Sequence, residues 1–81
     1  MDGLIEGRIV HYVMTDGRGA GLHRPAIIVH VWDKATGCVQ LQVFTDGSND
    51  GPEHAHGLLW ATSVSHSEDP MPRTWHWIER S

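Results

Sequence analysis

Two apolar segments in the middle of the chain, residues 25–32 and 38–44, constrain the fold more than any other feature of the sequence. The first is apolar at nearly every position. The second alternates, because glutamines separate Val39, Leu41 and Val43. A period of two is typical of a half-buried β-strand. The residues between the segments are polar and end in glycine, as in a hairpin loop. The sequence therefore predicts a central β-hairpin that supplies much of the core.

The rest of the chain extends this pattern into an all-β protein. No segment has helical spacing, and long glycine-containing loops separate the apolar segments. Closing five short strands into a barrel hides the strand edges that a flat sheet would expose. We therefore expect one domain over residues 1–81, folded as a small SH3-like, partly open barrel of about five antiparallel strands. In residues 58–66, even-numbered side chains are expected on one face and odd-numbered ones on the other. Besides the hairpin, strands are predicted at residues 4–15, 58–66 and 74–79.

Composition excludes several classes of protein. The net charge of −4 argues against a protein that coats long nucleic acids, whose affinity comes mostly from cationic contacts to phosphates. The single cysteine, Cys38, allows neither an intrachain disulfide nor a cysteine-based zinc site. No apolar run is long enough for a transmembrane helix, and no signal peptide is recognised, so we expect a cytoplasmic protein with no membrane partner. A short chain with four tryptophans, a residue enriched at interfaces, also favours a homo-oligomer.

Seven histidines raise the question of a metal site. His54 and His56 form an i, i+2 pair, but no further ligand motif supports them, and a solvated polar loop is the favoured interpretation. His11 and His30 interrupt apolar strands and could face each other across a sheet, although such residues are most often hydrogen-bonded core or interface histidines. We therefore predict no metal and no cofactor. Two more histidines lie near aromatic residues, where they could contact a ligand or titrate: His66 and His76.

The loop after the hairpin has three interpretations. Asp46, Ser48 and Asp50 have the odd-position spacing of a calcium loop, but the required later glutamate and helix are missing. Successive backbone N–H groups of a glycine-rich turn could instead bind a phosphate. A plain tight turn is the favoured interpretation. Hydrolytic motifs such as a GxSxG elbow are absent from the sequence.

Two family resemblances are visible. The segments HRPAIIV (23–29), LQVFTDGSND (41–50) and TWHW (74–77) resemble a family of short proteins from tailed phages, which implies a viral origin. More weakly, residues 7–10 followed by 21–29 are similar to the opening of MazF-type toxins. Those toxins are SH3-like barrels that cleave RNA. The second resemblance supports the fold more than the activity.

The viral resemblance suggests a function by analogy with small oligomeric phage proteins. We expect a protein that binds and sequesters a nucleotide-derived bacterial immune signal, of the cyclic nucleotide or cyclic ADP-ribose type, without cleaving it, in the cytoplasm of the infected host. The alternatives are a nucleotide- or RNA-cleaving enzyme and a structural or adaptor protein with no small ligand. Candidate ligand-binding residues are the stacking aromatics Tyr12, Phe44, Trp60, Trp75 and Trp77, the phosphate partners Arg18, His23 and Arg24, and the hydrogen-bonding residues Asp46 and Asn49.

Overall fold

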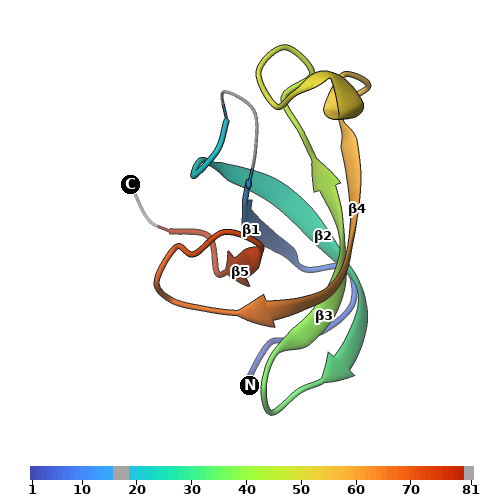
Figure 1. The fold of residues 1–81 in the computed structure, drawn as a ribbon. Coiled ribbons are helices and arrows are strands. Elements are labelled where there is room, and N and C mark those ends of the chain that lie inside the picture. The colour runs from blue at the N-terminus through green and yellow to red at the C-terminus, as the bar shows by residue number, and fades with distance from the viewer. Residues whose placement is uncertain (16–18, 80–81) are drawn as a thin grey trace.

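The computed structural model describes residues 1–15 and 19–79, with Glu53 described through its backbone alone. It is an all-β domain, as predicted, and the one helical element within these residues is a single 3-10 turn (Figure 1). The hairpin strands and the fourth strand lie almost where the sequence placed them, whereas the first and last strands are shorter. No helix among the described residues is long and apolar enough to cross a membrane. The elements are β1 (Ile9–Val13), β2 (His23–Asp33), β3 (Cys38–Phe44), η1 (Pro52–His54), β4 (Leu58–His66) and β5 (Thr74–His76).

The strands form a closed barrel in the order β1-β2-β3-β4-β5. Consecutive strands from β1 to β4 pair antiparallel, and β5 pairs antiparallel with β1, which closes the barrel. β4 and β5 pair in parallel, because residues 67–73 loop out and carry the chain back to the barrel wall (Figure 1). The small SH3-like barrel is thus confirmed. The expected partly open, wholly antiparallel arrangement is corrected to a closed, mixed one.

The central hairpin supplies the middle of the core. Val39, Leu41 and Val43 of β3 are fully buried, which confirms the period-two prediction and its register. Trp75 belongs to β5, whose pairing with β1 forms the seam of the barrel. Its side chain packs in the same core, and its indole Nε1 donates to the Gly37 carbonyl at 2.7 Å. The last strand therefore closes the barrel and also fills part of its core with the Trp75 side chain.

A bulge in β4 overturns the simple alternation predicted for this strand. Ala61 and Val64 are both buried, although one is odd-numbered and the other even-numbered. Ser63 between them has φ of 51°, and the pairing register with β3 shifts at this point. An extra residue in one strand leaves a pair unmatched and re-aims the side chains around it. As a result, Thr62 and Ser63 are both exposed on the outer surface of the barrel.

Candidate metal centre

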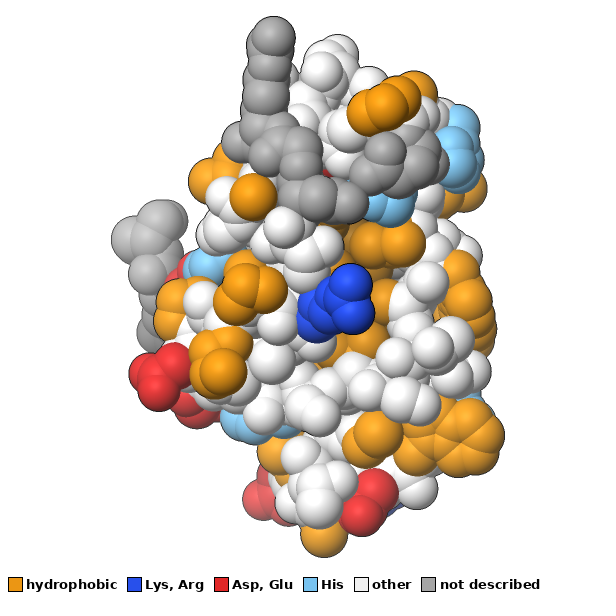
Figure 2. Space-filling view, in the orientation of Figure 1, with side chains coloured by type: hydrophobic (Ala, Val, Ile, Leu, Met, Phe, Trp, Pro, Cys, Tyr) orange, Lys and Arg blue, Asp and Glu red, His pale blue; other side chains and the backbone are white. Residues whose placement is uncertain are grey.

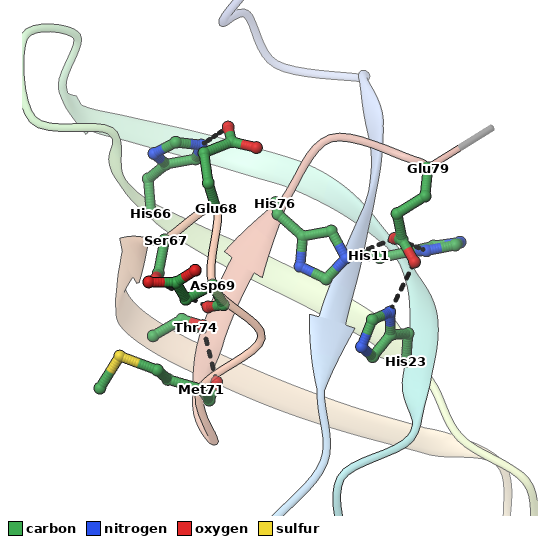
Figure 3. A network of polar contacts seen from close by, with 10 residues as sticks. All are labelled: His11, His23, His66, Ser67, Glu68, Asp69, Met71, Thr74, His76 and Glu79. Atoms are coloured by element: carbon green, nitrogen blue, oxygen red, sulfur yellow. Dashed lines mark hydrogen bonds and ion pairs between the residues drawn. The ribbon is translucent and has the colours of Figure 1, made fainter.

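Three histidines and one glutamate converge on the outside of the barrel seam (Figure 3). His11 comes from β1, His23 begins β2, His76 lies in β5, and Glu79 follows three residues later. Each offers one ligand atom, and these four atoms all lie within 4.8 Å of one another. Distant parts of the sequence thus form a compact cluster of nitrogen and oxygen donors, which we call the His–Glu cluster.

Strand alternation and pairing together produce the His–Glu cluster. Tyr12 and Trp75 are buried in the core, so their neighbours His11 and His76 point to the other side of the barrel wall. These two histidines are direct partners in the β1–β5 ladder. β1 also pairs with β2, and this pairing brings His23 alongside the end of β1. The closing of the barrel is therefore what assembles the site.

The Glu79 carboxylate lies at the centre of the cluster. His11 Nδ1 donates to its Oε1 at 2.8 Å, and His23 Nδ1 donates to its Oε2 at 2.9 Å. His76 Nε2 also donates to Oε1. Hydrogen bonds favour the ionised carboxylate, the one from His11 most strongly, and they lower the pKa of Glu79 from 4.5 to about 2. The cluster therefore carries one negative charge at neutral pH when its imidazoles are neutral.

His76 is the buried member of the cluster. Its Nδ1 has no hydrogen-bond partner among the described residues, and its side chain is 5 % exposed. A neutral ring with its proton on Nε2 donates to Glu79 and leaves Nδ1 as a bare acceptor. A neutral imidazole is the form that binds metals.

The distances in the cluster suit a tetrahedral ion. Zinc bonds to nitrogen and oxygen are about 2.1 Å long, so the ligand atoms of such a site lie roughly 3.4 Å apart. The two nitrogen–oxygen distances of 2.8 and 2.9 Å are slightly shorter than this, and the widest separation of 4.8 Å is longer. Side-chain rotations that move these atoms by roughly an ångström would therefore give the separation that zinc requires.

A pocket of about 310 Å³ opens beside the His–Glu cluster. His23, His76 and Glu79 line it together with Trp77 and Glu68. Glu68 accepts a hydrogen bond from His66 Nε2 at 2.9 Å and is a separate carboxylate from that of the cluster (Figure 3). The half-exposed Glu79 and this pocket give a small molecule a route to any ion held by the cluster.

Comparisons with known proteins give no match for this chain, whether with protein-family models, curated proteins or solved structures. The resemblances to a phage family and to MazF-type toxins therefore stay predictions, and the site is interpreted from its own geometry.

The structure places the polar residues that the sequence singled out in two groups. His23 belongs to the His–Glu cluster. Arg24 donates from Nε and Nη2 to the fully buried carboxylate of Asp50, at 2.7 and 3.0 Å, and these bonds lower the pKa of Asp50. Asp46 accepts hydrogen bonds from the Ser48 N–H and from the Asn49 side chain, so the loop is the tight turn that the sequence favoured. Arg18 lies outside the described residues.

The aromatic candidates are spread over the barrel. Trp75 is fully buried, and Trp77 packs edge-on against it at 5.1 Å between ring centroids. Tyr12 is also buried, whereas Phe44 and Trp60 are exposed. Tyr12 and Trp60 line one common groove, away from the His–Glu cluster.

The structure also bears on the two histidine pairs considered from the sequence, His11 with His30 and His54 with His56. His11 does not face His30, because β1 places it opposite Pro25 of β2, and the His30 ring instead packs against Trp32 at 4.4 Å. Within the described residues, His54 and His56 belong to no cluster of potential metal ligands. Local spacing singled out His54 and His56, but the four potential ligands that lie together come from separate strands, and only the β1–β5 pairing brings them side by side.

Acid is expected to remove the contribution of Glu79 to stability. Its pKa in the folded protein, about 2, lies below the ordinary value of 4.5, so the stabilisation is present above pH 4.5 and is lost as the pH falls towards 2. We expect the difference in free energy of unfolding between the wild type and Glu79→Gln to shrink over this range in chelator-treated buffer. Urea titrations at a series of pH values measure it. A difference that stays constant from pH 6 to pH 2 would contradict the assignment.

Proposed function

We propose that this protein binds a divalent transition-metal ion, Zn²⁺ by preference, through the side chains of His11, His23, His76 and Glu79. The observation that carries the proposal is the convergence of four donor atoms within 4.8 Å on the outer wall of the barrel. Three strands and the segment after β5 contribute to it, so a bound ion would also tie together the two sides of the barrel seam.

The donor set supports the choice of metal. Imidazole nitrogen suits zinc, copper, iron and nickel, whereas calcium and magnesium prefer sites built wholly from oxygen. Three neutral imidazoles and one carboxylate carry a single negative charge, which a divalent ion outweighs. Zinc binds readily to such mixed nitrogen and oxygen ligands in tetrahedral geometry.

Metal binding leaves one buried N–H group of His76 unpaired, and the free energy of coordination outweighs that cost. Coordination through His76 Nε2 requires the proton of the neutral ring to lie on Nδ1, which is buried and lacks a described partner. An unpaired buried donor costs about 1–3 kcal/mol, whereas structural zinc sites in zinc-finger peptides provide about 10–16 kcal/mol. The gain from coordination therefore exceeds this cost.

The position of the cluster supports a role beyond holding the fold together. Structural zinc sites are closed, whereas functional sites keep a coordination position for water or substrate. The ion would lie at the edge of the 310 Å³ pocket, with the half-exposed Glu79 on its outer side. Because the four side chains would fill a tetrahedral shell, we propose that an exogenous ligand binds as a fifth ligand or displaces the half-exposed Glu79.

Metal titration tests the proposal. We expect chelator-treated protein to bind one Zn²⁺ or Co²⁺ per chain by calorimetry, and the Co²⁺ complex to show the visible absorption of a tetrahedral or five-coordinate site. Zinc at a hundred times its Kd should add about 2.7 kcal/mol of stability and raise the Tm by about 10–20 °C. Azide should change the Co²⁺ spectrum, because it would bind as a fifth ligand or displace Glu79.

Matched histidine variants provide the control. His11→Ala, His23→Ala and His76→Ala should each remove most of the binding and the shift in Tm. His30→Ala and His56→Ala remove exposed histidines elsewhere and should leave both unchanged. The proposal is wrong if none of these ions binds at a stoichiometry of one, or if the two control variants lose binding as the cluster variants do.

A further inference from the structure

A second hollow lies away from the His–Glu cluster, in a groove of about 490 Å³ between β1, β4 and the residue that precedes β5. Tyr12 and Trp60 contribute aromatic walls, and Arg73 contributes a guanidinium group. No described residue that lines the groove is acidic. On the face drawn in Figure 2, a basic side chain stands over an apolar hollow. The volume is in the range of small-molecule sites, which are mostly apolar with a few polar groups.

The backbone is strained on both sides of this groove. Ser63 has φ of 51° and Arg73 has φ of 65°, and they are the two non-glycine residues with positive φ that the described part of the chain contains. Both line the groove. Side chains other than glycine are disfavoured in this left-handed region, and residues held there cluster at ligand sites and switch regions. Two such residues facing one groove point to a site that needs their side chains.

Arg73 is available to an anion. Its side chain is exposed and forms no ion pair or hydrogen bond with any described residue, whereas the Arg24 guanidinium is bonded to Asp50. Its backbone N–H donates to the Val13 carbonyl at 3.1 Å, so the main chain holds the residue at the groove. A guanidinium held in this way is suited to bidentate pairing with a phosphate or carboxylate.

The other groups in the groove suit a planar ring that bears hydroxyls. The Trp60 side chain is half-exposed on the wall, so one face of the indole can stack on a ring. The β4 bulge turns the hydroxyls of Thr62 and Ser63 outward beside it. Tyr12 and Trp60 are also candidate stacking residues by their sequence, whereas Arg73 is recognised from its position in the groove.

We propose that this groove binds a small planar anion of the nucleoside monophosphate type, with its phosphate on Arg73 and its base on Trp60. The hydroxyls of Thr62 and Ser63 bond to the polar edge of the ligand. The site is independent of the metal centre, because the two share no residue. The net charge of −4 favours a single small anion over a long nucleic acid.

Calorimetry with four probes tests the ligand class. AMP and GMP are titrated into chelator-treated protein, so that no metal ion can contribute to binding, and adenosine and inorganic phosphate are titrated in parallel. We expect a Kd below 1 mM for at least one of the two nucleotides, and at least tenfold weaker binding of adenosine and phosphate. Adenosine that binds as well as AMP would overturn the role of Arg73. Absence of nucleotide binding at millimolar concentration would overturn the proposal.

Two substitutions test whether the ligand binds in the groove, and the Tm of each variant shows whether the protein is still folded. Arg73→Gly removes the guanidinium and also relieves the positive φ, so it should weaken AMP and GMP binding at least tenfold while the Tm stays equal or rises. Trp60→Ala should weaken binding by roughly tenfold, the usual effect of losing one stacking contact. The matched controls Arg8→Gly and Trp32→Ala, both at exposed residues outside the groove, should leave the Kd unchanged. Binding that survives both groove substitutions would place the ligand elsewhere and refute the assignment.

Discussion

Arg24→Met is expected to lower the free energy of unfolding by about 3–5 kcal/mol, the usual result of leaving a buried charge without its partner. The Asp50 carboxylate is fully buried, and Arg24 supplies two of its hydrogen bonds. The Asp46 N–H supplies another at 2.6 Å. Urea denaturation measures the loss. The expected loss is a large fraction of the 5–15 kcal/mol typical of whole domains.

A double variant distinguishes the cost of leaving the Asp50 charge unpaired from the cost of lost packing around Arg24. Asp50→Asn keeps an oxygen that can accept the Asp46 N–H but carries no charge. Combined with Arg24→Met, it should therefore be less destabilising than the sum of the two single changes, by at least 1 kcal/mol. Strict additivity would mean that the two side chains contribute independently and that the ion pair does not hold the loop to β2.

Trp75→Ala is expected to cost a similar amount, about 3–5 kcal/mol, because it removes the largest fully buried side chain of the core. The change also leaves the Gly37 carbonyl without the indole donor. Chemical denaturation followed by far-UV circular dichroism measures it. Trp32→Ala is the matched control: that side chain is 59 % exposed, so its loss should change stability by about 0.5 kcal/mol or less. Equal effects of the two substitutions would show that Trp75 does not plug the barrel.

Local patterns in the sequence predicted the elements of the fold well. The alternation of Val39, Leu41 and Val43 gave the burial of β3 correctly, because each side chain's direction follows from its own strand. The bulge in β4 was not predictable in this way. Ser63 adopts its left-handed φ where no glycine or proline marks the position, and the register follows from packing against β3.

The candidate sites depended on pairings that no local pattern encodes. Alternation along β5 places Trp75 in the core and His76 in the His–Glu cluster. What the sequence could not supply was the neighbour of β5, because a short last strand can pair with either edge of a sheet. Once β1 is that neighbour, His11 and His76 become partners. Arg73 likewise has no motif around it in the sequence. Its positive φ and its position in the groove are visible only in the structure.

β5 contributes Trp75 to the core and His76 to the His–Glu cluster, so local opening of this strand affects both sides of the barrel wall. The strand has three residues and is held by short ladders to β1 and β4, so it is the natural place for a sub-global opening that leaves the hairpin intact. Such an opening would withdraw Trp75 from the interior and His76 from the outer wall in a single step. Amide hydrogen exchange in β5 and in its β1 partners should therefore follow one shared rate, well above that of β3. An ion bound on the outside would slow that rate and so protect an interior it never touches.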